Sequence, residues 1–334
     1  MSQIPIKSPQ IAIIGSGLAG LTCATALQGF ADVQVFEKSF FCGGRLSRYQ
    51  FGEYSSNYGE QWFTISNPLF LKLVNAWQAS GIVRPLDGWV VELDKGQVLN
   101  LDDNTRRFTG YPYMHVITDN LARNCQLKLS TSIVEIEKMD TGQWRLFDDR
   151  GAYQGIYDIV IMATAAHQLG SISGIVDSIS SVVEKIDMTV CWEAMFAFEK
   201  PLNLPFDAAF VLDSPLSWAS RFRKAGAEND APECWVVHSS HEWSLQYVTS
   251  FRGRVMHALQ NAFFEACDIA PVKLVTSKTH LWKHALPINT LGEDCLFDEN
   301  AALGACGDWC TAPRIEGAVL SGFSMADRIM KFIK

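Results

Sequence analysis

The sequence has no Cys-x-x-Cys pair and no hydrophobic run long enough to span a bilayer. Its nine cysteines are scattered, which in a chain of 334 residues indicates reduced thiols rather than a disulfide framework. Cys306 and Cys310 are the nearest pair, but no histidine stands at ligand spacing beside them, so we expect no metal site. These features favour a cytoplasmic protein that is not embedded in a membrane.

Positive charge is scarce relative to negative charge. The chain has 28 Lys and Arg against 36 Asp and Glu, a net charge of −8 at pH 7. That balance argues against a surface for nucleic acid or anionic lipid, because both attract proteins through clustered basic residues. Hydrophobic residues make up 48% of the chain, enough for a folded globular protein with an ample core. We expect the protein to be a monomer or a homodimer.

The most informative segment follows the first hydrophobic run. Residues 11–14 are all apolar, which predicts a buried parallel strand, and they lead directly into Gly15-Ser16-Gly17-Leu18-Ala19-Gly20. Gly15 suits a tight turn, Gly17 lets a phosphate approach bare backbone, and Gly20 lets a helix lie close to the strand. A helix predicted over residues 18–28 would aim its positive N-terminal end at the anion.

A second apolar strand, predicted over residues 33–36, stops at Glu37. The Glu37 carboxylate can accept hydrogen bonds from both hydroxyls of a ribose, and it would repel a 2′-phosphate. A glycine-rich turn without a ligand is the plain alternative. The strand, loop, helix, second strand and terminal acid together favour a nucleotide site, for either NAD or FAD.

Elsewhere the chain alternates between two kinds of segment. Strands are predicted over residues 127–137, 143–147 and 157–163, the last of them a fully apolar strand of the buried parallel kind. Residues 88–108 predict a hairpin. Aromatic-rich strands dominate the middle of the chain, followed by a single helix predicted over 245–266.

We therefore expect an α/β fold with a discontinuous nucleotide-binding domain. It would comprise residues 1–70, 112–168 and 286–334. Residues 71–111 and 169–285 would form an inserted α+β substrate-binding domain of mainly antiparallel sheet.

Four further stretches carry a resemblance to a known family. They are Gly43-Gly44-Arg45-Leu46, then Tyr58-Gly59-Glu60-Gln61-Trp62-Phe63-Thr64, then residues 235–244, and then Gly307-Asp308-Trp309 with the residues on to Gly322. Together with the glycine loop they resemble the FAD-binding amine oxidase superfamily, and more closely the bacterial renalase-like flavoproteins. The chain departs from the family's acidic-Leu-Gly-Ala-Gln-Tyr pattern at residues 57–62. The resemblance implies a glutathione-reductase-type Rossmann domain, and FAD bound non-covalently.

The resemblance also implies individual roles. The glycine loop would hold the pyrophosphate, Glu37 the adenosine ribose, and Val134 would present its backbone to the adenine. Arg45 would neutralise phosphate charge, and Asp308 would bind a ribityl hydroxyl unless it is merely a helix N-cap or a turn acid. The amides of Glu316, Gly317 and Ala318 would face the flavin N1 edge, where a helix N-terminus stabilises negative charge. The other residues predicted to bind the cofactor are Ser16, Ala19, Lys38, Gly44, Gln61 and Trp62.

The resemblance to the bacterial proteins implies an oxidase whose substrate is a misreduced dihydronicotinamide nucleotide, 2- or 6-dihydro-NAD(P). Hydride would pass to the flavin and electrons to O2, giving NAD(P)+ and H2O2. Such a site needs orientation and an aromatic wall more than a strong base. Gln61, Trp62, His238 and Trp282 are the candidates to line it. A flavin amine oxidase acting on a small amine, and a non-catalytic flavin-binding redox sensor, stay open as alternatives.

Several of these side chains have plainer interpretations. His238 lies in a strand-like run and could be a core histidine, while Trp282 and Trp243 could simply pack. His241 and His280 are expected at the surface or behind the site. Arg221 and Arg223 are expected to be solvated charges, although they could attract substrate phosphates.

Overall fold

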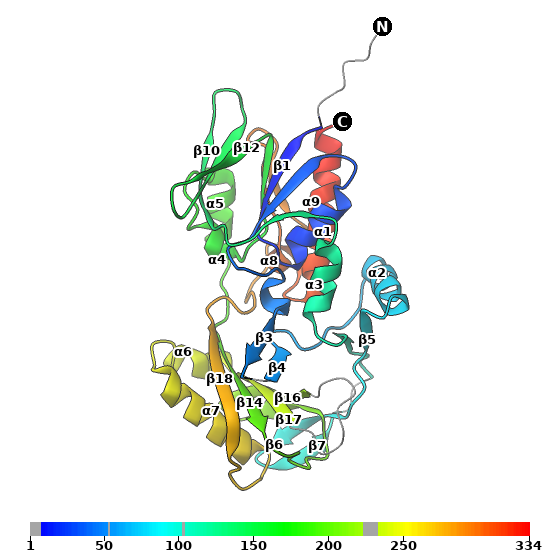
Figure 1. The fold of residues 1–334 in the computed structure, drawn as a ribbon, viewed down its shortest axis with the longest axis vertical. Coiled ribbons are helices and arrows are strands. Elements are labelled where there is room, and N and C mark those ends of the chain that lie inside the picture. The colour runs from blue at the N-terminus through cyan, green and yellow to red at the C-terminus, as the bar shows by residue number, and fades with distance from the viewer. Residues whose placement is uncertain (1–7, 53, 102–103, 223–232) are drawn as a thin grey trace.

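The computed structural model describes residues 8–52, 54–101, 104–222 and 233–334. It has two parts, each built around a large sheet, which lie at the top and the bottom of Figure 1. The upper sheet has six strands and the lower sheet has seven. The predicted fold, a Rossmann-like domain with a second, sheet-rich domain, is confirmed.

The six-stranded sheet is parallel except at one edge. Its strands lie in the order β19 (Leu296–Asp298), β20 (Leu303–Ala305), β13 (Ile159–Met162), β1 (Gln10–Ile14), β2 (Asp32–Phe36) and β9 (Gln126–Lys128). Only β19 and β20 pair antiparallel. Strand β1 pairs with β2 on one side and with β13 on the other, so the strand order reverses beside it. Ligands bind to open α/β sheets at such a switch point, beyond the carboxyl ends of the strands.

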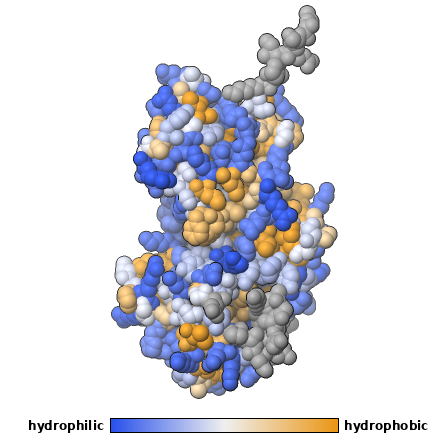
Figure 2. Space-filling model, viewed as in Figure 1, coloured by the Kyte–Doolittle hydropathy of each residue, from blue (hydrophilic) through white to orange (hydrophobic). Residues whose placement is uncertain are grey.

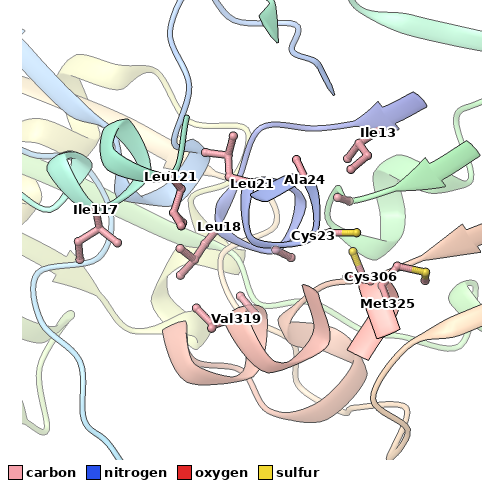
Figure 3. Packing of buried hydrophobic residues seen from close by; sticks show 14 of the residues in the cluster. Ile13, Leu18, Leu21, Cys23, Ala24, Ile117, Leu121, Cys306, Val319 and Met325 are labelled. Atoms are coloured by element: carbon pink, nitrogen blue, oxygen red, sulfur yellow. The ribbon is translucent and has the colours of Figure 1, made fainter. Parts of the chain in front are cut away.

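Both faces of this sheet are covered. On one face lie the helices α1 (Leu18–Ala26), α3 (His115–Ala122) and α9 (Ile315–Phe332). Figure 3 shows Leu18 and Leu21 of α1 packed near Leu121 of α3 and Val319 of α9. On the other face lie α4 (Ala166–Leu169), α5 (Asp177–Val183) and an antiparallel sheet of β10 (Ile133–Lys138), β11 (Trp144–Asp148) and β12 (Tyr153–Tyr157). The run of apolar residues in β1 reflects this double burial.

The lower sheet is mainly antiparallel. Its strands lie in the order β18 (Leu274–Trp282), β14 (Cys191–Phe198), β17 (Glu233–Ser239), β16 (Leu216–Phe222), β15 (Ala208–Leu212), β6 (Val90–Asp94) and β7 (Gln97–Asn100). Only β15 and β6 pair in parallel. Helix α7 (Arg252–Ala266) covers one face, and α6 (His241–Gln246) lies at its end. The hairpin of β3 (Arg48–Phe51) and β4 (Tyr54–Asn57) packs on the other face.

Shorter elements complete the fold. They are the 3-10 turn η1 (Gly44–Leu46), α2 (Pro68–Ala79), β5 (Val83–Pro85), β8 (Phe108–Gly110) and α8 (Asp308–Thr311). Phe70, Val74 and Trp77 of α2 belong to the core of the six-stranded sheet. The predicted domain ranges stay a proposal, and by this packing we would count α2 with the nucleotide-binding domain.

Two predicted elements are wrong in extent. The helix predicted over 245–266 is interrupted between Gln246 and Arg252, where the β-branched and hydroxyl-bearing residues of the segment 247–251 favour helix poorly. The strand predicted over 127–137 is two strands in different sheets. The chain turns between them at Ser130, whose φ is +51° and whose amide donates to the Ser39 carbonyl at 2.9 Å.

Across the parts of the chain that the structure describes, every helix is too short or too polar to cross a bilayer.

Candidate functional site

A cavity of about 640 Å³ lies at the carboxyl edge of the six-stranded sheet. The loops after four parallel strands line it, through Gly15 after β1, Glu37 after β2, Thr164 after β13 and Asp308 after β20. Its walls extend from Val134 of β10 at one end to Trp282 of β18 in the lower sheet at the other. Figure 2 shows hydrophobic residues gathered where the two parts of the molecule meet. The topology thus brings segments from both ends of the chain to one site.

The glycine loop has the geometry of a phosphate cradle. Gly15 has φ +108°, and a Cβ there would lie 2.7 Å from the Ala163 carbonyl oxygen. A Cβ on Gly20 would lie 2.1 Å from the Gly15 carbonyl oxygen, so α1 can approach the loop only without a side chain. A Cβ on Gly17 would meet nothing within 4 Å, because that position faces the cavity. The loop therefore fits a diphosphate group.

Glu37 and Ser16 hold the loop in this shape. The Ser16 amide and hydroxyl donate to Oε2 of Glu37 at 3.0 and 2.8 Å, and the Ser39 amide donates to Oε1 at 2.9 Å. Glu37 is 8% exposed and lines the cavity beside Lys38. The contact of Glu37 with a ribose stays a prediction. The three hydrogen bonds give Glu37 a structural role as well, since they hold the glycine loop in its conformation.

Arg45 and Asp308 meet each other in the cavity. The guanidinium donates two hydrogen bonds to the carboxylate, at 2.8 and 2.7 Å, and a third to the Ala285 carbonyl at 2.7 Å. Burial opposes the charge on Arg45, but the Asp308 carboxylate raises the pKa of Arg45 above its ordinary value. Glu60 lies nearby, and burial raises its pKa to about 6 although Arg45 acts in the opposite direction. Arg45 therefore stays charged within the cavity, paired with Asp308, and its role toward a phosphate stays a prediction.

Asp308 is the first residue of α8, but its side chain does not cap that helix. The N-cap is Gly307, which makes no side-chain bond, and both carboxylate oxygens of Asp308 bond to Arg45. The contact with a ribityl hydroxyl stays a prediction, while the capping alternative finds no support in this geometry.

The start of α9 reaches the cavity mainly through its backbone and apolar side chains. Ala318 and Ile315 line the cavity. The Glu316 carboxylate instead accepts from the Ser66 amide at 2.7 Å and the Asn67 amide at 2.9 Å, which ties α9 to the N-terminus of α2. A Cβ on Gly317 would lie 2.1 Å from the Ala312 carbonyl oxygen. Glu316 and Gly317 thus contribute to packing at this helix end. The contact of their backbone amides with a flavin stays a prediction.

Three aromatic side chains form the wall of the cavity on the lower sheet. The ring centroids of Tyr58 and Trp282 are 4.7 Å apart, and His280 lies 4.6 Å from each. All three line the cavity. The expectation that His280 lies at the surface or behind the site is wrong, because β18 brings it to the cavity between Tyr58 and Trp282.

The other three predicted catalytic residues lie outside the cavity lining. Gln61 is buried and donates to the Gly59 carbonyl at 3.0 Å. The Trp62 ring lies 5.7 Å from the Trp218 ring. His238 lies on β17, with Nε2 4.0 Å from Oε2 of Glu193. Of the four, only Trp282 lines the cavity.

Glu193 is the residue that the sequence reasoning missed. It lies on β14 and is 0% exposed. Its Oε2 accepts from Trp282 Nε1 at 2.7 Å and from the Gly59 amide at 3.1 Å, so it fixes the cavity wall from behind. Burial raises its pKa to about 8 in spite of these two donors. A lone acid in the otherwise apolar run of β14 was the available signal.

A Glu193→Gln substitution should remove a pH dependence of stability. Wild-type Glu193 titrates near 8 when folded but near 4.5 when unfolded, so the folded protein binds an extra proton between these values. Stability therefore falls as pH rises through this window. The free energy of unfolding of the variant, taken relative to that of wild type, should therefore be roughly 2–4 kcal/mol higher at pH 9 than at pH 5. Urea denaturation at both pH values measures this, and a constant difference would contradict the assignment.

Arg221 corrects another expectation. Its side chain is 8% exposed, donates to the Leu204 carbonyl at 2.7 Å and pairs with Asp207 at 3.3 Å. Its guanidinium also lies 5.2 Å from the Trp235 ring centroid, so it is a packed structural charge rather than a solvated one. Arg223 lies outside the described residues. Trp243 stacks on Tyr247 at 4.1 Å, which fits the packing interpretation.

Comparison with known proteins bears on the fold. Residues 13–77 match the model of an NAD(P)-binding Rossmann-like domain. A protein from Exiguobacterium sp. 255-15, proposed to be a protoporphyrinogen oxidase, superposes with a TM-score of 0.78 at 12% identity, covering 97% of this chain and 99% of that one. A single mutant of putrescine oxidase, redesigned for cofactor binding, superposes with a TM-score of 0.76 at 11% identity and the same coverage.

The chain shares the fold of these proteins. Both similarities extend over nearly the whole length of each chain, so they include the lower sheet as well as the Rossmann-like part. At this level of identity, the chemistry has to be argued from the site itself.

Proposed function

We propose that the protein is an FAD-dependent oxidase that takes hydride from a dihydronicotinamide nucleotide. In the overall reaction a 2- or 6-dihydro-NAD(P), O2 and one proton give NAD(P)+ and H2O2. A bound flavin would supply the hydride acceptor and the reactivity with O2. The fold of the two oxidases compared above supports a flavin enzyme, and the site features below support the substrate.

The cavity supports a dinucleotide cofactor along its length. Gly17 and the N-terminus of α1 would hold the diphosphate, and Glu37 and Val134 lie at the end suited to adenosine. Asp308, which bonds to Arg45, and Ala318 also line the cavity. The sequence around residues 15–20 provides the only such loop that we identified, so the chain would bind one dinucleotide there and receive its substrate from the side of the lower sheet.

The observation that carries the substrate class is the positive charge at the cavity. Burial lowers the pKa of His284, and His167, Lys38, Lys283 and Arg45 lower it further. His284 and His167 stack with centroids 5.3 Å apart. Lys38 and Arg45 are assigned to the cofactor and Arg45 pairs with Asp308, so Lys283, which follows Trp282 in the cavity lining, is the charge left to favour a phosphate-bearing substrate over a cationic amine.

The chain's own residues then orient the reacting ring. Tyr58 and Trp282 offer flat apolar faces against which a pyridine ring can lie, and Glu193 holds the Trp282 indole in place. Hydride leaves the ring as it becomes aromatic, and no proton needs to leave carbon. Positioning is therefore the main demand on these side chains.

A small amine is the second candidate, favoured by a different observation. The Tyr58 and Trp282 rings lie near two carboxyl groups, Glu60 and Glu193, and aromatic rings with acids can hold an ammonium group. Burial raises the pKa of both acids, which leaves less negative charge at neutral pH to attract it.

An anaerobic screen of flavin reduction tests the proposal. The flavin-loaded protein is mixed in turn with 2- and 6-dihydro-NAD(P), ordinary NADH and putrescine, and its absorbance near 450 nm is followed. We expect the dihydronicotinamide isomers to bleach the flavin within seconds and the others slowly. Fast bleaching by the amine alone would favour the second candidate, and no bleaching by any of them would favour a non-catalytic flavoprotein.

A further inference from the structure

The chain leaves the lower sheet through a short turn that lines the cavity. Strand β18 ends at Trp282, and the chain turns at Lys283 and His284 directly after it. All three residues line the cavity. Neighbouring residues within a strand point to opposite faces, but this constraint ends with β18, so Trp282 and Lys283 can line the same cavity. Residues 283–285 are here called the exit turn.

Contacts with three other segments hold the exit turn in place. The Ala285 carbonyl accepts from the Arg45 guanidinium at 2.7 Å, and the Ala285 amide donates to the Thr189 carbonyl at 2.9 Å. The His284 ring stacks on His167 of α4 with centroids 5.3 Å apart. The backbone of the exit turn is therefore fixed beside the aromatic wall, so a ligand would not have to order a loop in order to bind there.

Lys283 is the basic residue of the exit turn that no acid neutralises. Arg45, which contacts the turn, forms an ion pair with Asp308. The Lys283 ammonium, in contrast, forms no ion pair with any carboxylate of the described residues. Lys283 is exposed and lines the cavity, so both solvent and a ligand in the cavity can reach it. Its charge is available to an anionic ligand.

A nucleotide suits the step from Trp282 to Lys283. In the proposed function, the pyridine ring lies against Tyr58 and Trp282. A ribose separates such a ring from its 5′-phosphate. Consecutive Cα atoms lie about 3.8 Å apart, and the lysine side chain adds a flexible four-carbon stem, so the ammonium group can span the additional length of a ribose.

We propose that Lys283 binds the 5′-phosphate next to the substrate's nicotinamide ribose and thereby selects nucleotides over free pyridines and amines. The ammonium group would donate to the phosphate oxygens, and it would repel a cationic amine. Lys283 takes no part in hydride transfer, because its role is to select the molecule that presents a ring to the aromatic wall. This inference rests on the proposed function, which supplies the ring.

Two other exposed basic residues line the cavity and serve as comparisons. Arg314 directly precedes α9, at the helix end predicted to face the flavin. Lys38 follows Glu37, at the end of the cavity suited to adenosine. Of the three, only Lys283 directly follows a residue of the aromatic wall. Replacing Arg314 or Lys38 should therefore affect the cofactor more than the substrate's phosphate.

Nicotinamide riboside and nicotinamide mononucleotide differ only in the 5′-phosphate and provide the test. Binding of each to the flavin-loaded protein is measured by calorimetry at pH 7.5 and low salt. We expect wild type to bind the mononucleotide at least about tenfold more tightly, and this ratio should fall as salt is added. Lys283→Met should bring the ratio close to one and leave the affinity for the riboside unchanged. Lys283→Arg should keep most of the ratio, because it keeps the charge.

Lys278→Met is the matched control. It removes the same charge from the same strand, but Lys278 Nζ lies 5.8 Å from the Tyr49 ring centroid, and Lys278 does not line the cavity. Circular dichroism melts establish that each variant folds, and fluorescence titration gives its affinity for FAD. We expect Lys278→Met to keep the wild-type ratio, and Lys283→Met to keep the wild-type affinity for FAD.

Three outcomes would overturn the phosphate subsite. One is equal binding of the two ligands by wild type, including binding of neither. Another is a ratio that is kept in Lys283→Met but lost in Arg314→Met or Lys38→Met. The third is weaker FAD binding by Lys283→Met with an unchanged ratio, which would assign this charge to the cofactor. If the ratio behaves as expected but dihydronicotinamides do not bleach the flavin, the proposed reaction fails while the phosphate subsite stands.

Discussion

A Gly17→Ala substitution should abolish tight flavin binding and leave the stability of the apoprotein nearly unchanged, whereas Gly20→Ala should destabilise the fold. A Cβ on Gly17 meets nothing in the protein, so it would occupy the space into which a diphosphate fits. We expect the stability of that apoprotein to change by less than about 1 kcal/mol. A Cβ on Gly20 would lie 2.1 Å from backbone oxygen, which no side-chain rotation relieves, and should cost about 3 kcal/mol or more.

The two variants thus separate ligand binding from folding. Urea denaturation of the apoproteins and fluorescence titration with FAD measure the two effects. Wild-type flavin affinity in Gly17→Ala would show that the diphosphate does not use this loop. Gly29→Ala is a poor control because its φ is +80°. Gly170→Ala is suitable, since that glycine has a φ of −61° and a Cβ there would only make an ordinary contact with the His167 carbonyl oxygen at 3.8 Å.

An Asp308→Ala substitution should cause the protein to purify with little flavin. It removes both acceptors of the Arg45 guanidinium from the middle of the cavity, and leaves that cation with only the Ala285 carbonyl as an acceptor in the structure. Removing one partner from a buried ion pair typically lowers folding stability by about 3–5 kcal/mol. Because the Arg45 side chain is 27% exposed, we expect a loss of roughly 2–3 kcal/mol in folding stability here. The flavin content of Asp308→Asn should lie between those of wild type and Asp308→Ala, because the asparagine amide keeps one oxygen acceptor but not the negative charge.

The ratio of absorbance near 450 nm to that at 280 nm measures the flavin retained. Asp327→Ala is the matched control, since Asp327 forms an exposed pair with Lys331 on α9. Wild-type flavin content in Asp308→Ala would contradict the role given to this carboxylate.

The local features of the Rossmann-like unit could be predicted because they depend on neighbours in sequence. An apolar run, three glycines at fixed spacing and a second apolar run predicted β1, α1 and β2 closely. Backbone sterics in a tight turn act over a few residues, so the sequence carries them directly. The helix over 245–266 failed at its interior for a related reason: a hydrophobic pattern alone does not register a short segment of poor helix formers.

The arrangement of side chains on the lower sheet could not be predicted from neighbours in sequence. Glu193, His238 and His280 are far apart in the chain, and only the antiparallel register of β14, β17 and β18 places them in one row. Sequence reasoning considered each histidine alone, so it assigned His280 to the surface and did not consider Glu193. Side-chain alternation in a strand says which residues share a face, but not which strand comes next.

By itself, the sequence determined that this protein folds around a Rossmann-like βαβ unit and that its second domain is mainly sheet, because hydrophobic period and glycine spacing are local properties. The tertiary structure alone decided that Arg45 pairs with Asp308 and that Trp282 rests on a buried acid. It also decided which buried polar atoms on the lower sheet lack a hydrogen-bond partner among the described residues. Those arrangements depend on strand order and register, which bring together residues that the chain separates by most of its length.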